Sequence, residues 1–193
     1  MAETPSSFLL KPGDAAPGFS LPDMISRTQV DFSLVQGPRG TLVIFACNHC
    51  PYVILLADAL GEWAAAATTR GVSTVAINAN DVERYPADAP DRMAPFAGEH
   101  GWKFPYLYDE SQQVAHAYGA ACTPDFFLLD GEGKLFYAGQ FDDARPGNGK
   151  EVSGKDLTEA LECLLEGRSA PAPFRPSLGC GIKWKPGSEP RVS

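Results

Sequence analysis

The residues best suited to chemistry are the two cysteines of the sequence CNHCP, Cys47 and Cys50. They follow an apolar run at residues 41–46 and precede a segment that predicts a helix from Pro51. Cysteines three residues apart at a helix start lie one turn from each other, close enough to form a disulfide or share a metal ion. The helix N-terminus favours a thiolate because its N–H groups carry partial positive charge. The pattern therefore predicts a thiol–disulfide redox site.

The position of each CxxC residue predicts its role. We expect Cys47 to attack the substrate, because it is predicted to lie nearest the helix start and to be the more exposed of the two. Cys50, predicted to lie one turn into the helix, would then resolve the mixed disulfide by attacking Cys47. His49 can place an imidazolium or an N–H donor near the Cys47 thiolate. The alternatives are two unreactive core cysteines and a solvent-facing histidine with little effect.

The chain holds three further cysteines, each with two interpretations. Cys122 is either a third redox thiol or a small buried apolar residue. Cys180 is flanked by glycines in the C-terminal tail. Glycines allow a close backbone approach, so this tail could dock Cys180 onto the active site as a resolving thiol; otherwise it is an incidental tail cysteine. Cys163 lies in a predicted helix, where a packing role is favoured.

Composition excludes several classes of function. A formal net charge of −8 argues against a nucleic-acid surface, which needs a basic patch. The apolar stretches are too short for a membrane-spanning helix. The first residues show no secretory signal, and five cysteines is an odd number that suits a reducing compartment. The sequence therefore predicts a cytoplasmic protein with neither a nucleic-acid nor a membrane partner.

The order of predicted elements indicates an α/β fold. We expect a central mixed sheet with helices on both faces, ending in an antiparallel hairpin and a helix. Three parts are predicted: an N-terminal extension over residues 1–28, one domain over 29–167, and a Pro-rich, irregular tail over 168–193 that carries Cys180. Strands are predicted over 41–46, 72–78, 106–108, 125–129 and 134–138, and helices over 51–70, 91–100, 111–118 and 156–166.

A CxxC after the first core strand and a Thr-Pro before the hairpin resemble the thioredoxin fold. More narrowly, the chain resembles the peroxiredoxin-like branch of the redoxin families, which is related to the alkyl hydroperoxide reductase and thiol-specific antioxidant group. The stretches that carry the resemblance are FACNHCPYV (45–53), AINAND (76–81), FPYLYDE (104–110), VAHAYGAACTPDFFLLD (114–130), DDARP (142–146) and PSLGCGIKW (176–184).

This resemblance implies roles for residues distant from the CxxC in sequence. It implies a cis peptide bond at Thr123-Pro124 beside the CxxC, with the Thr123 backbone hydrogen-bonding a bound thiol partner. The peroxiredoxins carry Pro and Thr upstream of a single peroxidatic cysteine, and here Val43 and Cys47 align with them. Cys50 then falls at the peroxidatic position, so the residues that position peroxide are incomplete.

Four functions compete. The leading one is a thiol–disulfide oxidoreductase that uses Cys47 and Cys50 and is reset by a thioredoxin- or glutathione-type reductant. The second is a thiol peroxidase that reduces hydroperoxides through a sulfenic acid. The third is a Zn- or Cu(I)-binding protein with ligands from Cys47, Cys50 and one of His49, Cys122 or Cys180. The last is a redox-inert binding module. No Gly-x-Gly-x-x-Gly turn follows a strand, so no nicotinamide or flavin cofactor is expected.

Overall fold

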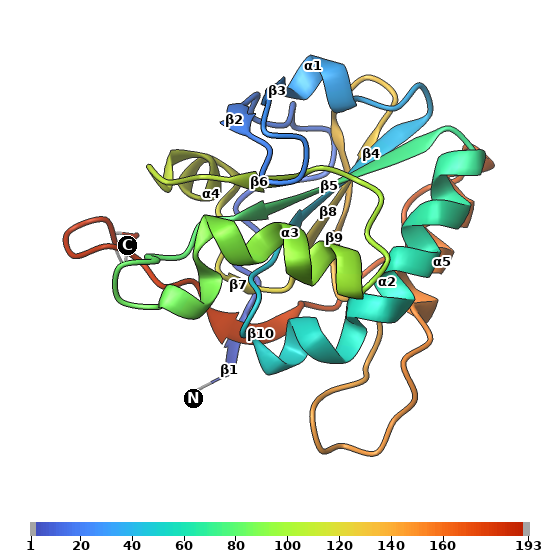
Figure 1. Cartoon of the computed structure of the whole chain (residues 1–193). Helices are drawn as coiled ribbons and strands as arrows, with labels where there is room; N and C mark the ends of the chain where they lie inside the picture. Colours follow the sequence, from blue (N-terminus) through green and yellow to red (C-terminus); the bar gives the residue numbers. More distant parts are fainter. Residues whose placement is uncertain (1–2, 191–193) are drawn as a thin grey trace.

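A five-stranded mixed sheet forms the centre of the computed structural model, which describes residues 3–190 (Figure 1). The strand order is β6-β5-β4-β8-β9. Strands β4, β5 and β6 run parallel, and β8 pairs antiparallel with both β4 and β9. The strand bounds are Gly40–Phe45 for β4, Val72–Asn78 for β5, Tyr106–Tyr108 for β6, Asp125–Asp130 for β8 and Leu135–Gly139 for β9.

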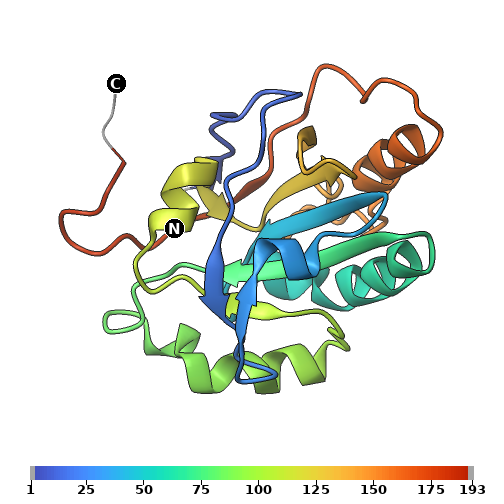
Figure 2. The ribbon, with the colours of Figure 1, turned by 90° about the horizontal axis from the view of Figure 1, so that it is seen from above.

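Helices cover both faces of this sheet (Figures 1 and 2). Successive residues of a strand point to opposite faces, so each face has its own apolar cluster. Helices α2, α3 and α5 pack on one face, whereas α1, α4 and the β2–β3 hairpin pack on the other. Their bounds are Phe32–Val35 for α1, Pro51–Thr69 for α2, Pro90–Glu99 for α3, Gln113–Tyr118 for α4, Lys155–Leu165 for α5, Pro86–Asp88 for the 3-10 turn η1, Ser20–Pro22 for β2 and Gln29–Asp31 for β3.

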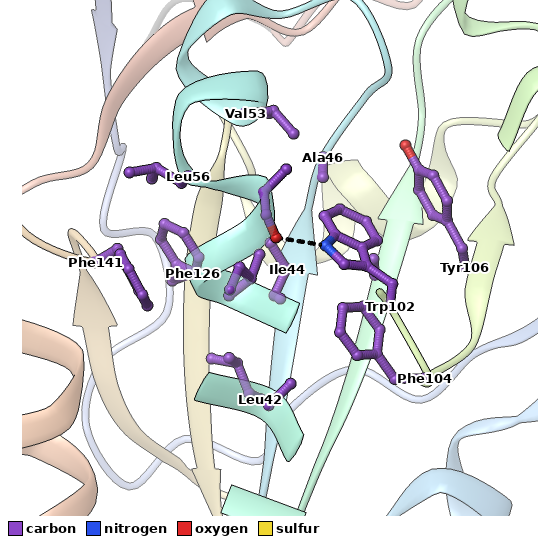
Figure 3. Packing of buried hydrophobic residues seen from close by; sticks show 14 of the residues in the cluster. Leu42, Ile44, Ala46, Val53, Leu56, Trp102, Phe104, Tyr106, Phe126 and Phe141 are labelled. Carbon is purple, nitrogen blue, oxygen red and sulfur yellow. Dashed lines mark hydrogen bonds between the residues drawn. The ribbon is translucent and has the colours of Figure 1, made fainter. Parts of the chain in front are cut away.

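The packing of α2 against β4 fixes the position of the CxxC segment between them. Leu42 and Ile44 project from β4 toward this helix, and Leu56 faces them (Figure 3). The indole Nε1 of Trp102 donates a hydrogen bond of 2.9 Å to the Ala57 carbonyl of α2 (Figure 3). Because these side chains are nearly fully buried, they resist any sliding of the helix along the sheet.

A second, three-stranded sheet joins the two ends of the chain. Strand β10 (Leu178–Gly181) lies between β1 (Glu3–Pro5) and β7 (Cys122–Thr123), antiparallel to both. The prediction that the tail is irregular from Arg168 onward is therefore wrong at β10. Its two glycines disfavour a strand, yet the strand forms because its backbone groups find partners on both sides.

The predicted fold class and order of elements are confirmed. Each expected strand and helix lies within two residues of its predicted bounds, including the hairpin of β8 and β9. The predicted divisions between residues 28 and 29 and between 167 and 168 stay predictions. Among residues 3–190, every helix is too short or too polar to cross a membrane.

Candidate active site

The CxxC segment is the loop between β4 and α2. Strand β4 ends at Phe45, and Pro51 begins the helix, where its fixed φ suits the first helical position. Cys50 is the residue immediately before the helix, and its carbonyl accepts the Ile54 N–H at 2.9 Å. Cys47 lies three residues further out. The prediction that Cys47 is nearest the helix start, with Cys50 one turn inside, is therefore wrong.

Thr123 contacts both cysteine sulfurs. The peptide bond between Thr123 and Pro124 is cis, as the resemblance implied. The Sγ atom of Cys47 lies 3.4 Å from the Thr123 hydroxyl, and the Cys50 thiol donates to the Thr123 carbonyl at 3.0 Å. All five cysteines are free thiols in this structure. The strand before the hairpin thus forms one wall of the site.

The carboxylate of Asp88 forms the opposite wall. One of its oxygens accepts the backbone N–H groups of Asn48 at 2.8 Å and His49 at 3.1 Å. The other accepts the Asn80 side-chain amide at 2.8 Å. Asp88 is fully buried. These bonds connect the loop after β4 to the loop after β5, so they fix the path of the chain between the two cysteines.

The His49 ring is held on the same side. Its Nδ1 lies 2.7 Å from the second Asp88 oxygen, and the ring stacks on Tyr85 at 5.9 Å between centroids and 7° between planes. About a quarter of the side chain is exposed, 23%. Buried carboxylates fix the orientation of the histidines they bind. His49 is therefore neither freely rotating nor wholly solvent-facing, and it lies beside Cys47 with its ring orientation set by Asp88.

The surroundings of Cys50 favour its thiolate. The interaction with the Cys47 thiol lowers the pKa of Cys50 most, and the Thr123 side chain and the backbone N–H groups of Val53 and Cys180 lower it further, against the opposing effect of burial. The position at the N-terminus of a 19-residue helix acts in the same direction. Cys50 is the sulfur that the local structure stabilises as an anion.

Cys47 has the opposite environment. Its interaction with Cys50, its burial and the nearby Asp88 charge all raise the pKa of Cys47 well above the ordinary value. The exposed fractions are 1% for Cys47 and 0% for Cys50, so Cys47 is not an exposed nucleophile. The three reasons for assigning the attack to Cys47, which were helix position, exposure and easy ionisation, do not hold in the structure.

The sequence matches the family model described as Redoxin over residues 11–155. That match covers most of the chain. The chain belongs to the redoxin family.

Two curated relatives give this family its chemistry. Over 155 residues, this redoxin is 28% identical to peroxiredoxin Bcp of Escherichia coli, covering 74% of this chain and 92% of Bcp. Over 161 residues, it is 24% identical to the thiol-disulfide oxidoreductase ResA of Bacillus thuringiensis, covering 80% of this chain and 76% of ResA. The protein is a thiol-dependent oxidoreductase, and the thiol–disulfide reading is the one supported.

Solved structures give the same fold. An uncharacterized conserved protein from Geobacillus kaustophilus matches with a TM-score of 0.93 and 46% identity, covering 97% of this chain and 98% of that one. The thioredoxin domain of a thiol-disulfide oxidoreductase from Bacteroides vulgatus matches with a TM-score of 0.55 and 19% identity, covering 67% of this chain and 88% of that one. The predicted thioredoxin-like fold is confirmed.

The other three cysteines of this redoxin occupy different surroundings. Cys180 lies on β10 opposite Thr123, and its interaction with Cys50 contributes to raising the pKa of its thiol. Cys122 is fully buried, and its thiol donates to the Pro124 carbonyl at 3.5 Å. Cys163 lies on α5 and accepts a bond from Arg168 at 3.0 Å. Of these three, Cys180 is the one that lies opposite Thr123, the residue that contacts both CxxC sulfurs.

Among residues 3–190, the side chains placed to share a metal ion are a different set from the predicted ones. Ligand atoms of Cys47, His49 and Asp88 lie within 4.8 Å of one another. Both Asp88 oxygens already accept N–H hydrogen bonds, so the loop itself accounts for the carboxylate. The predicted ligand sets contained two cysteines and no carboxylate. Metal binding is therefore not the favoured function of this redoxin.

Sequence reasoning missed Asp88. The loop from Tyr85 to Pro90 looks like a proline-rich connection, in which an aspartate is ordinarily solvated. The available signal was topological. Parallel strands bring the loops after their C-terminal ends together, so polar residues in the connection after β5 were candidates to reach the CxxC loop after β4. Asn80 in that connection binds the same carboxylate.

Proposed function

We propose that Cys47 and Cys50 are the redox pair of this oxidoreductase and that Cys50 supplies the attacking thiolate. One observation carries the proposal: the Cys50 sulfur lies at the N-terminus of α2 near the backbone N–H groups of Val53 and Cys180, whereas the Cys47 sulfur lies near the Asp88 carboxylate. The thiolate, not the thiol, is the nucleophile in disulfide exchange. The roles of the two cysteines are thus the reverse of those expected from sequence.

The reaction has two exchange steps. The Cys50 thiolate attacks one sulfur of a substrate disulfide, forms a mixed disulfide and releases the first thiolate. The Cys47 thiol then loses its proton, attacks the Cys50 sulfur and releases the second substrate thiol. The substrate disulfide is reduced by two electrons, and the two cysteines become one disulfide. Atoms balance, because the Cys47 proton leaves with a product thiol.

His49 and Asp88 assist the second step. A ring nitrogen of His49 lies within 4.8 Å of the Cys47 sulfur, and Asp88 orients the ring. A neutral imidazole can accept the proton that Cys47 must lose. Because the Cys47 pKa is raised, resolution by Cys47 needs such an acceptor more than the attack by Cys50 does.

The burial of both sulfurs indicates the substrate class. Cys47 and Cys50 are 1% and 0% exposed, and β10 already pairs with the strand edge at Thr123. An extended protein segment would have to displace β10 to pair there. We infer that the substrate is a low-molecular-weight disulfide.

The same features suggest the reductant and the compartment. Stabilising the Cys50 thiolate stabilises the reduced protein, which makes the Cys47–Cys50 disulfide more oxidising. Such a disulfide is readily reduced by a glutathione-type reductant, which, unlike a thioredoxin-type protein, need not displace β10. An odd number of cysteines, five, also suits the reducing cytoplasm, where we place the protein.

The test is to mix pre-reduced protein with one equivalent of oxidised glutathione and follow glutathione release. We expect two glutathione molecules per protein and an intramolecular disulfide that contains Cys50. Cys163→Ser, which changes a buried cysteine on α5, is the matched control and should behave like the wild type. Oxidation by hydrogen peroxide far faster than by oxidised glutathione would instead assign a peroxidase.

A further inference from the structure

Strand β10 places a third thiol at the redox pair. Cys180 is in register with Thr123, whose carbonyl lies 3.0 Å from the Cys50 sulfur. The N-terminal end of α2 and β10 lie side by side in Figure 1, and the two elements are in contact. Cys47, Cys50 and Cys180 belong to one buried cluster. Cys50 thus has a cysteine neighbour on each of two separate segments.

The glycines beside Cys180 make this approach possible. A Cβ atom at Gly179 would lie 2.1 Å from the Thr123 carbonyl oxygen, a distance that no side chain tolerates. On the other side, a Cβ at Gly181 would lie 3.0 Å from the Thr4 hydroxyl of β1. The glycine at position 179 allows β10 to lie this close to β7, and this packing sets Cys180 opposite Thr123, in the same buried cluster as Cys50.

The protonation states suit an exchange between these two sulfurs. Burial, together with the interaction with Cys50, raises the pKa of Cys180 to about 11. Cys180 therefore stays a thiol under conditions in which Cys50 is a thiolate. The arrangement repeats the one between Cys47 and Cys50, with a neutral thiol beside the same anion. Lys183, three residues along the chain, lowers the Cys180 pKa and so eases its ionisation when it reacts.

We propose that Cys180 is a third redox thiol of this protein and that it resolves Cys50-bound mixed disulfides as an alternative to Cys47. The proposal rests on the function proposed above, because it needs Cys50 to attack. The Cys180 sulfur attacks the Cys50 sulfur of the mixed disulfide, forming a Cys50–Cys180 disulfide. The bound substrate half leaves as a thiol and takes the Cys180 proton. The oxidant is the same low-molecular-weight disulfide.

Cys122, next to Thr123 on β7, serves as the comparison for Cys180. Its thiol is bonded to the Pro124 carbonyl rather than to a sulfur. It is opposite Gly181 rather than opposite a cysteine. Cys122 is fully buried and is not opposite Thr123, which predicts that it takes no part in the exchange.

The test uses the full chain with Cys47→Ser, which leaves Cys50 and Cys180 in place. The variant is reduced, mixed with oxidised glutathione, blocked and digested with trypsin. The tryptic peptides separate the thiols: residues 40–70 carry Cys50, residues 104–134 carry Cys122 and residues 169–183 carry Cys180. We expect the 40–70 and 169–183 peptides to be joined by a disulfide, with two glutathione molecules released per protein.

Two variants in the Cys47→Ser background complete the experiment. Adding Cys180→Ser or Cys180→Ala should stop the reaction at a stable Cys50–glutathione mixed disulfide with one glutathione released. Two substitutions of different polarity guard against a folding defect caused by either one. Adding Cys122→Ser should leave the Cys50–Cys180 disulfide unchanged.

The results distinguish the two proposals. In Cys47→Ser alone, a stable Cys50–glutathione adduct with Cys180 still reduced overturns the third-thiol proposal and leaves the Cys50 attack intact. No glutathione release at all overturns both. A disulfide that joins Cys122 to Cys50 would also contradict the assignment of Cys180.

Discussion

The two sides of the CxxC loop differ in charge. On the Cys47 side, the buried Asp88 carboxylate holds the loop backbone and the His49 ring. On the Cys50 side, the start of α2 and the backbone of β10 turn N–H groups toward the sulfur. Two cysteines three residues apart therefore have opposite tendencies to ionise. The comparison teaches that the polarity of a CxxC pair is set by what surrounds each sulfur, not by its place in the motif.

Removing the Cys50 sulfur should have the largest effect. Cys50→Ser takes away the stabilised thiolate, so we expect release of glutathione from oxidised glutathione to slow by at least about 10³-fold. Cys47→Ser should keep the first release at close to the wild-type rate. Stopped-flow detection of the released thiol measures both. If Cys47→Ser abolishes the first release of glutathione and Cys50→Ser does not, Cys50 is not the attacking thiolate.

Removing the charge on the Cys47 side should have the next largest effect. Asp88→Asn places an amide N–H₂ against N–H donors in a fully buried site, so we expect the free energy of unfolding to fall by about 3 kcal/mol. The pKa of Cys47 should fall as well, because Asp88 contributes to raising it. Urea unfolding and a thiol titration measure the two effects.

The matched control is Asp91→Asn, which neutralises an exposed aspartate in the first turn of α3. It should change neither quantity. A folded Asp88→Asn protein whose Cys47 titrates as in the wild type would show that the carboxylate does not set the polarity of the pair.

A second buried carboxyl group lies at the start of β8, beside the wall of the site that Thr123 forms. Burial raises the pKa of Asp125, next to Pro124, to about 6, although Ser6 and backbone N–H groups bond to it. An unfolded aspartate titrates near pH 3.9. The folded state therefore keeps this proton longer, so the stability that it contributes is complete below about pH 4 and is lost as pH rises through about 6.

We expect ionisation of Asp125 to lower the unfolding free energy of the wild type by about 3 kcal/mol between about pH 4 and pH 7. Asp125→Asn should remove this pH dependence. Urea titrations at a series of pH values give the difference between the two proteins. A difference that stays constant across this range would contradict the assigned pKa.

The histidine should have the smallest effect. His49→Ala removes a partly exposed ring, so we expect unfolding free energy to change by at most about 1 kcal/mol. The second glutathione release should slow in the Cys180→Ser background, where Cys47 alone resolves, while the first release stays at its usual rate. Slowing of the first release instead would place His49 beside the attacking sulfur, contrary to the account.

The sequence predicts the scaffold well for identifiable reasons. Strand β4 is an unbroken apolar run, α2 starts at Pro51 and ends before Gly71, and a tight turn joins β8 to β9. These are local signals, readable without knowledge of the rest of the chain. The cis peptide at Thr123-Pro124 followed from the family resemblance rather than from any local pattern.

The site depends on contacts between distant segments, which the sequence hides. Strand β10 contains two glycines and forms only because β1 and β7 pair with it. Asp88 binds a loop about 40 residues earlier in the chain. Which of the two cysteines ionises first depends on whether Cys50 lies just before the helix or one turn inside it. The predicted helix start at Pro51 is correct and already places Cys50 just before the helix, so the error lay in assigning the roles and not in the boundary.

A single titration tests the central claim most directly. With ¹³Cβ-labelled cysteine in the reduced wild-type protein, the Cβ chemical shift of each cysteine reports its ionisation without any need for a reagent to reach a buried sulfur. Single cysteine-to-serine variants assign the resonances. We predict that Cys50 titrates well below the ordinary cysteine pKa of about 8.5, while Cys47 and Cys180 remain thiols above it. Ionisation of Cys47 before Cys50 would contradict the account.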